Sequence, residues 1–176
     1  MLRDKIKQDL LTLRLHENPS VVKDAGICLG SIATVELPVG LWDEFRTMMA
    51  NDAANEDSKY RLAAVQTLGY TMEFIDIYKK QSLNSNQIFQ VLDSLPSIIL
   101  NIDSENLELT KIAVHSLGRA VPFQKEFARD DHRALIDEVI SKALAIEDPE
   151  VWELAWSVMP RPSDLAPNSL RLILTD

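Results

Sequence analysis

Ala64-Val-Gln-Thr-Leu68-Gly69 decides the fold of this 176-residue chain, because its pattern A-x-x-x-[LM]-[GP] occurs four times. The other copies are Ala25-Gly-Ile-Cys-Leu29-Gly30, Ala113-Val-His-Ser-Leu117-Gly118 and Ala155-Trp-Ser-Val-Met159-Pro160. Successive alanines are 39, 49 and 42 residues apart. Each copy lies in an apolar stretch of helical period, so the sequence predicts a stack of helical repeats that bury their apolar faces against one another.

A period of about 40–47 residues with two helices per unit is typical of HEAT and armadillo-like helical arrays. We therefore expect an all-α fold, a HEAT-repeat right-handed superhelical solenoid of about four helix pairs. The predicted units are about 2–36, 37–76, 84–123 and 130–160, and 161–176 is a tail or the start of a further repeat. The polar turns inside the units should cap the second helices, and Pro96 should kink or interrupt the helix that contains it.

The composition narrows the range of functions. Aromatic residues make up 6% of the chain and there are only 5 glycines, which disfavours a β-sandwich or barrel. No apolar run approaches the length of about 18 residues that a membrane helix needs, and the single cysteine suits a reducing compartment. The net charge of −9 argues against nucleic acid as a partner. It favours basic partners, although it could also serve solubility alone.

The chemically active side chains do not form a recognisable site. His16, His115 and His132 lack metal-ligand spacing, and Cys28 fits best as a small buried hydrophobic residue. Trp152 and Trp156 are four residues apart, which favours a packing ridge over a ligand site. The common nucleotide-binding and hydrolase motifs are absent from the sequence. We therefore expect no enzyme activity, no catalytic residues, no bound metal and no cofactor.

Several stretches are more specific than the repeat. Glu36-Leu-Pro-Val-Gly-Leu-Trp42-Asp-Glu44-Phe45 resembles the E-[IL]-P-x-x-x-W-x-E-[LF] segment of the importin-β (karyopherin-β) family. Three further segments resemble motifs of that family in the same order: Leu68-Gly69-Tyr70, Ser85-Asn86-Gln87-Ile88 and Phe123-Gln-Lys125-Glu-Phe127. The resemblance covers roughly residues 5–145 and corresponds to early repeats. The segment between Ser85 and Ala113 is about four residues longer than the family pattern, so the alignment there has two solutions.

The resemblance implies a nuclear import receptor of protein cargo. In that family the second, inner helices of early repeats contact Ran-GTP, which implicates Val21–Thr34 and Ser58–Phe74 here without singling out individual residues. Grooves between first, outer helices bind phenylalanine-glycine (FG) repeats of nucleoporins. The implied groove pairs Leu135 and Ile136 with Ile98 and Ile99 under one alignment, or with Phe89 and Leu92 under the other. Ordinary packing between repeats is the alternative role for each of these six residues.

The resemblance also implies a monomer that shuttles between cytoplasm and nucleus through the nuclear pore, with no nucleic-acid or membrane partner. The adaptor importin-α and cargo would be held mainly by later repeats outside this chain. The apolar ends of the sequence suggest a fragment of a longer array. The competing hypotheses are a general HEAT-repeat scaffold for complex assembly and, from a different class, a helical-repeat enzyme.

Overall fold

The computed structural model describes residues 2–79, 95–102, 105–119, 137–138 and 140–158. Its named elements are α1 (Leu2–Leu13), α2 (Pro19–Glu36), the 3-10 helix η1 (Leu37–Val39), α3 (Glu44–Ala53), α4 (Ser58–Lys79), α6 (Leu95–Ile99), α7 (Leu107–Gly118) and α9 (Pro149–Val158). Residues 137–138 and 140–144 are also helical. No strand occurs in the described part of the chain, and the predicted all-α class is confirmed.

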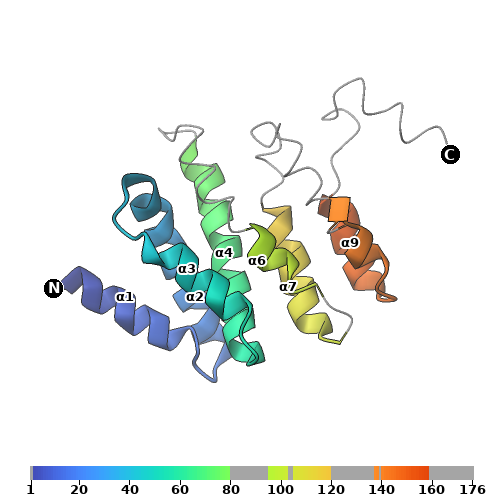
Figure 1. Cartoon of the computed structure of the whole chain (residues 1–176), viewed down its shortest axis with the longest axis horizontal. Helices are drawn as coiled ribbons and strands as arrows, with labels where there is room; N and C mark the ends of the chain where they lie inside the picture. Colours follow the sequence, from blue (N-terminus) through green and yellow to red (C-terminus); the bar gives the residue numbers. More distant parts are fainter. Residues whose placement is uncertain (1, 80–94, 103–104, 120–136, 139, 159–176) are drawn as a thin grey trace.

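The helices are stacked in chain order, from α1 at one side of the molecule to α9 at the other (Figure 1). The second helices form a continuous layer in which α2 packs on α4, α4 on α7, and α7 on α9. The first helices α1, α3 and α6 each pack on the second helix that follows them. Each helix therefore packs within its own repeat and against the adjacent repeats, as in an array of repeats. The predicted unit boundaries stay a prediction, and the tail at 161–176 lies outside the described residues.

The polar turns cap the second helices, as the sequence predicts. The Asn18 side chain accepts a hydrogen bond from the Ser20 N–H at 2.9 Å, and Pro19 occupies the first turn of α2. The Asn106 side chain accepts from the Leu109 N–H at 3.1 Å at the start of α7. Asp148 does the same for α9, where its Oδ1 accepts from two backbone N–H groups at 3.0 Å. These caps pair donors that the first turn of a helix would otherwise leave free.

The repeated alanine pattern forms the centre of the core. Ala25, Ala64, Ala113 and Ala155 are all buried, as are the leucines four residues after the first three of them: Leu29, Leu68 and Leu117. Among the described residues the largest fully buried side chain is Phe45 of α3, which forms one core cluster with Leu29, Leu68 and Leu117. The apolar period of α4 also places Val65, Leu68 and Met72 in the core, whereas Leu62 is only partly buried.

The glycine that ends the pattern allows two second helices to touch. A Cβ atom on Gly30 of α2 would lie 2.9 Å from the backbone nitrogen of Thr71 and 2.9 Å from the Cβ of Tyr70, both on α4. A Cβ on Gly69 of α4 would likewise lie 2.7 Å from the Cβ of Ser116 on α7. Contacts this short do not occur between relaxed atoms, so both helix crossings need a residue without a side chain.

Small hydroxyl side chains fill the same crossings without leaving polar groups unpaired. Thr34 Oγ1 lies 2.8 Å from the Gly30 carbonyl oxygen and 3.2 Å from that of Thr71 across the α2–α4 interface. Ser116 Oγ donates to the Val65 carbonyl oxygen at 3.3 Å across the α4–α7 interface. Buried hydroxyls are tolerated when they find such acceptors.

The prolines separate elements where the structure describes them. Helix α2 ends at Glu36, two residues before Pro38 in η1. Pro96 is the second residue of α6, a position where a helix tolerates proline because the N–H there needs no helical partner. The kink predicted at Pro96 would involve residues before Leu95, which lie outside the described part. Pro122 also lies outside it.

Two glycines one helical turn apart on α2 provide a direct test of this packing. A Cβ on Gly26 would meet Thr67 and Tyr70 only at 3.5 Å, which is ordinary contact. We expect Gly30→Ala to lower the free energy of unfolding by about 1–3 kcal/mol, because the two backbones must separate. Gly26→Ala should be neutral or should stabilise the chain by up to about 1 kcal/mol, because alanine favours the helix. Urea unfolding followed by circular dichroism measures both values, and equal effects would contradict the close-approach role of Gly30.

Candidate binding surfaces

The predicted FG-repeat groove falls largely outside the described residues. Phe89, Leu92, Leu135 and Ile136 all lie in segments that the structure does not describe. Ile98 and Ile99 of α6 are described, and they are 0% and 4% exposed within the core. In the described part they therefore occupy ordinary packing positions between repeats, and their role in a groove stays a prediction.

The Glu36–Phe45 segment ties α1 to the rest of the array. Glu36, at the end of α2, is buried. Its carboxylate accepts hydrogen bonds from two side chains of α1, the Arg3 Nε at 2.6 Å and the Lys7 Nζ at 3.0 Å. The Lys7 ammonium also lies 4.6 Å from the centre of the Trp42 ring. Trp42 in turn packs on Phe45, with ring centres 4.7 Å apart. The stretch that carries the family resemblance therefore has a structural role at the α1–α2–α3 junction.

Glu36 stays ionised because of these two cations. Burial raises the pKa of the Glu36 carboxyl group, but the hydrogen bonds from Arg3 and Lys7 outweigh burial and hold the pKa below its usual value. A carboxylate whose pKa is lowered in the folded state stabilises the fold above the pKa of the unfolded chain. That contribution disappears as the pH falls through the folded-state pKa.

This cluster yields a prediction about stability and pH. At neutral pH Glu36→Gln should lower the free energy of unfolding by about 2 kcal/mol, because Lys7 stays buried without its anion. The difference from the wild-type chain should shrink as the pH falls below the usual pKa of a glutamate. Glu44→Gln, at an exposed position of α3, is the control and should change stability by less than about 0.5 kcal/mol. A pH-independent effect of Glu36→Gln, measured by thermal unfolding at several pH values, would contradict this account.

The second-helix stretches implicated in Ran binding offer little open surface. On α2 the exposed side chains between Val21 and Thr34 are Lys23, Asp24 and Cys28. On α4 Ser58 and Lys59 are the fully exposed residues between Ser58 and Phe74, and most of the others pack against α2, α3 and α7. The side chain of Glu73 is also 45% exposed, so the accessible parts of the α4 stretch are its amino-terminal end and Glu73.

Two residues lie on different faces from those predicted. Cys28 is exposed, because it shares the outward stripe of α2 with Asp24 and Val35 and not the buried stripe of Ala25 and Leu29. The tryptophans of α9 are also exposed, Trp152 by 40% and Trp156 by 64%, and so do not form a packed ridge. The buried positions of α9 are Val151 and Ala155, one residue before each tryptophan, so the helix directs the rings to an adjacent face.

The histidines give no evidence of a metal site. His115 is exposed on α7, and its pKa is lowered, first by partial burial and then by the charge of Arg119, with Glu73 acting in the opposite direction. His16 lies in the turn after α1, where its Nδ1 accepts a hydrogen bond from the Asn18 N–H at 3.0 Å. His132 lies outside the described residues. Within the described part, no three histidine, cysteine or acidic side chains are grouped closely enough to hold a metal ion, and no helix there is long and apolar enough to cross a membrane.

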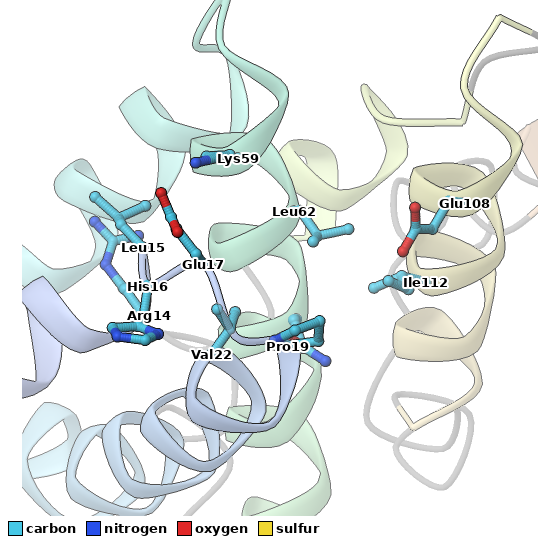
Figure 2. A pocket seen from close by; sticks show the side chains of 11 residues that line it. Arg14, Leu15, His16, Glu17, Pro19, Val22, Lys59, Leu62, Glu108 and Ile112 are labelled. Carbon is cyan, nitrogen blue, oxygen red and sulfur yellow. The ribbon is translucent and has the colours of Figure 1, made fainter.

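A pocket of about 320 Å³ opens at the amino-terminal ends of three successive second helices (Figure 2). One wall is the turn after α1, with Arg14, Leu15, His16 and Glu17. The other contributors lie in the amino-terminal parts of α2, α4 and α7: Pro19, Val22, Lys59, Leu62, Gln66, Glu108 and Ile112. The volume is near the lower end for ligand pockets, about 300–1,000 Å³. No local sequence pattern marks this pocket, because its walls come from segments far apart in the chain.

Arg14 links this pocket to the next unit. Its Nη2 lies 2.5 Å from the Asp52 Oδ2 near the end of α3, and both side chains are largely buried. A similar link joins α7 to α9, where the Lys111 Nζ lies 2.5 Å from the Glu150 Oε2 and 3.6 Å from the Asp148 Oδ1. Charged pairs at the turns therefore connect neighbouring units on the side of the molecule where the pocket opens.

Comparisons with known proteins identify relatives among the importins. The chain is 26% identical over 161 residues to importin subunit beta-1 of Saccharomyces cerevisiae, covering 89% of this chain and 18% of that protein. It is 27% identical over 89 residues to probable importin subunit beta-4 of Schizosaccharomyces pombe, covering 50% of this chain and 8% of the relative. No protein-family model matches the chain.

Solved importin-β structures have the same fold. The match to the Kap95:Nup1 complex has a TM-score of 0.74 at 24% identity. It covers 89% of this chain and 18% of the matched chain of the complex. A crystal structure of importin-β gives 0.77 at 18% identity, with 99% of this chain and 21% of that one covered. These findings confirm the predicted HEAT-repeat superhelix and the resemblance to an importin-β fragment. The chain spans about a fifth of the length of these proteins.

Proposed function

We propose that this chain, which is similar to a fragment of the importin-β HEAT-repeat array, is part of a nuclear transport receptor. It binds Ran-GTP through its second helices and nucleoporin FG repeats through grooves between first helices, and it serves protein import. It acts as a binding protein and not as an enzyme, in the cytoplasm, the nucleus and the nuclear pore. The observation that carries the proposal is the continuous similarity to importin subunit beta-1 over 161 residues.

The geometry of the Glu36–Phe45 segment supports this proposal over a general scaffold. A HEAT array needs apolar faces and small residues at helix crossings, and these requirements do not call for Glu36 or Trp42. In this chain both residues form specific contacts with α1. The similarity to the Kap95:Nup1 complex supports nucleoporin binding as part of the proposal. A general scaffold for complex assembly is the alternative, and the two experiments below separate it from a transport receptor.

Binding to FG repeats should be weak and multivalent. Burying one phenylalanine ring contributes about 1.5–3 kcal/mol, less than the usual cost of association. Many such sites on one partner then act together through a high effective concentration. Fast exchange at each site suits passage through a pore, where tight binding would stop transport.

Leu135→Asp and Ile136→Asp test the nucleoporin groove. Either change should reduce retention on immobilised FG-repeat peptide at least about fivefold, because a carboxylate would have to be desolvated in the groove. Leu144→Asp is a matched control, since Leu144 is already 37% exposed in the helical segment 140–144. Circular dichroism must show that every variant is folded. Failure of the intact chain to bind the peptide would contradict the nucleoporin part of the proposal.

A pull-down with Ran tests the second-helix contact. The chain should retain GTP-loaded Ran and not GDP-loaded Ran, although weakly, because in the family the Ran site extends into further repeats. Exchanging the charges of two exposed α2 residues, as Lys23→Asp with Asp24→Lys, keeps the net charge and should reduce retention about fivefold. Glu44→Gln on the first helix α3 should have no effect. Equal retention of both nucleotide forms, or of all variants, would favour the general scaffold.

A further inference from the structure

Two tryptophan side chains of α9 are exposed on one face of the helix. Trp152 is 40% and Trp156 is 64% exposed, and their spacing of four residues places both rings on the same side. The same helix contributes Val151 and Ala155 to the core of the array. Large apolar side chains grouped on a surface mark a place where another segment packs.

The repeated pattern shows what the corresponding face of the other second helices contacts. On α2 the positions one and five residues after the pattern alanine are Gly26 and Gly30, where a Cβ atom would meet α4 at 3.5 Å and 2.9 Å. On α4 the same positions are Val65 and Gly69. The Val65 carbonyl oxygen accepts a hydrogen bond from Ser116 of α7 at 3.3 Å, and a Cβ on Gly69 would lie 2.7 Å from the Cβ of the same serine. This face of α2 and of α4 is therefore covered by the next second helix.

On α9 the same face carries bulky residues. The positions one and five residues after Ala155 are Trp156 and Pro160, and Trp152 lies one helical turn earlier. Glycine at the other crossings lets two helices touch, whereas indole rings hold a neighbouring backbone away. The face of α9 therefore suits a segment that packs its side chains on the rings, and not a helix at the spacing of α2 and α4.

The residues that follow α9 contain a segment with matching apolar spacing. Leu170-Arg-Leu172-Ile-Leu174 lies outside the described part, and its three leucines alternate with other residues. In an extended segment alternate side chains share one face and lie about 6.6 Å apart. The two tryptophans lie about 6 Å apart along the helix axis. Two successive leucines of this set therefore match the two rings.

The connection is long enough for this segment to reach the tryptophans. Leu170 follows Val158, the last residue of α9, by 12 positions. Such a connection spans up to about 40 Å, and the 10-residue helix is about 15 Å long. A short connection also gives the segment an effective concentration on the order of millimolar at the helix, so a modest apolar contact is enough to hold it there.

The charges favour this segment over a second copy of the helix. The charged side chains of α9 are Glu150 and Glu153. Glu150 pairs with Lys111, whereas Glu153 is exposed. Two α9 helices packed face to face would bring like charges together. Arg171 instead brings a positive charge to this acidic helix.

We propose that the face of α9 formed by Trp152 and Trp156 binds the segment 170–174 of the same chain. The leucines of the segment pack on the two rings, and Arg171 pairs with Glu153. The segment then occupies the face that the next second helix covers on α2 and α4, and it competes with any partner that docks there. The proposal does not depend on Ran or nucleoporin binding, and either proposal can fail while the other holds.

Nuclear Overhauser effects in the full 176-residue chain test the contact directly. Cross-peaks should join the methyl protons of the three leucines to the indole protons of Trp152 and Trp156. A mixture of labelled and unlabelled chains separates contacts within one chain from contacts between two copies. Absence of these cross-peaks, or cross-peaks between copies alone, would overturn the proposal.

Variants of the full chain test the apolar contact. Leu172→Asp should lower the equilibrium constant of docking at least about tenfold, because a carboxylate would have to lose water against the rings. Thr175→Asp adds the same charge beside the segment and is the matched control, which should leave docking unchanged. Quenching of tryptophan fluorescence by acrylamide measures docking, since Trp42 is buried and changes little. Equal quenching of Leu172→Asp and the wild-type chain, with both folded by circular dichroism, would overturn the proposal.

A charge exchange tests the ionic contact. Arg171→Glu should weaken docking about threefold, and by less at high salt. Adding Glu153→Arg should restore docking, because the pair is then reversed and not removed. Unchanged docking of Arg171→Glu, or no recovery in the double variant, would overturn the role of Arg171.

Discussion

The contact between the backbones of successive second helices is the constraint on which the rest of the structure depends. At Gly30 the space beside α2 is filled by the backbone of α4, and at Gly69 the space beside α4 is filled by Ser116 of α7. This spacing lets the leucine that precedes each glycine reach the same core. It also brings hydroxyl groups such as Thr34 within reach of carbonyl groups on the neighbouring helix. In the described part of the chain the crossings between second helices are therefore closed, and partners can reach only side chains that point away from them, such as Lys23 and His115.

The closed layer determines where function can be located in the described part of the chain. Most of the stretch 58–74 of α4 is covered by its neighbours, and its fully exposed residues lie at its amino-terminal end. The same end holds the pocket, the Arg14–Asp52 pair and the caps of the second helices. Of the aliphatic side chains there, Leu62 and Ile112 are only partly buried and Val22 is buried. Recognition of partners and packing between units therefore use different segments of the same helices.

The elements that could be predicted from sequence are those set by local pattern. The four-residue spacing of alanine and leucine identified the buried stripe, and Asn18, Asn106 and Asp148 marked helix starts because their side chains pair with N–H groups a few residues away. The all-α class followed from these two signals. The predicted groove stays a prediction, because most of its residues lie outside the described part.

The features that the sequence analysis missed depend on contacts over long distances in the chain. Glu36 pairs with a residue 33 positions away, and Arg14 with one 38 positions away, and no local pattern marks these partners. Cys28 and Trp156 were assigned to packed faces from their apolar neighbours alone. A one-residue step along a helix turns a side chain by about 100°. Cys28 and Trp156 were therefore placed on the right helices but on the wrong faces, because each lies one position from a buried residue.

The ties between neighbouring units also determine how the molecule carries a load. Arg3 and Lys7 of α1 pair with Glu36 at the end of α2. Arg14, in the turn after α1, pairs with Asp52 of α3, and Lys111 of α7 pairs with Glu150 of α9. The first of these ties lies within the predicted unit 2–36, and the other two bridge adjacent units, so a bending force passes from unit to unit through the joints in series. Small rotations at each joint then add along the array. The bending stiffness of the array is therefore limited by its least stiff joint.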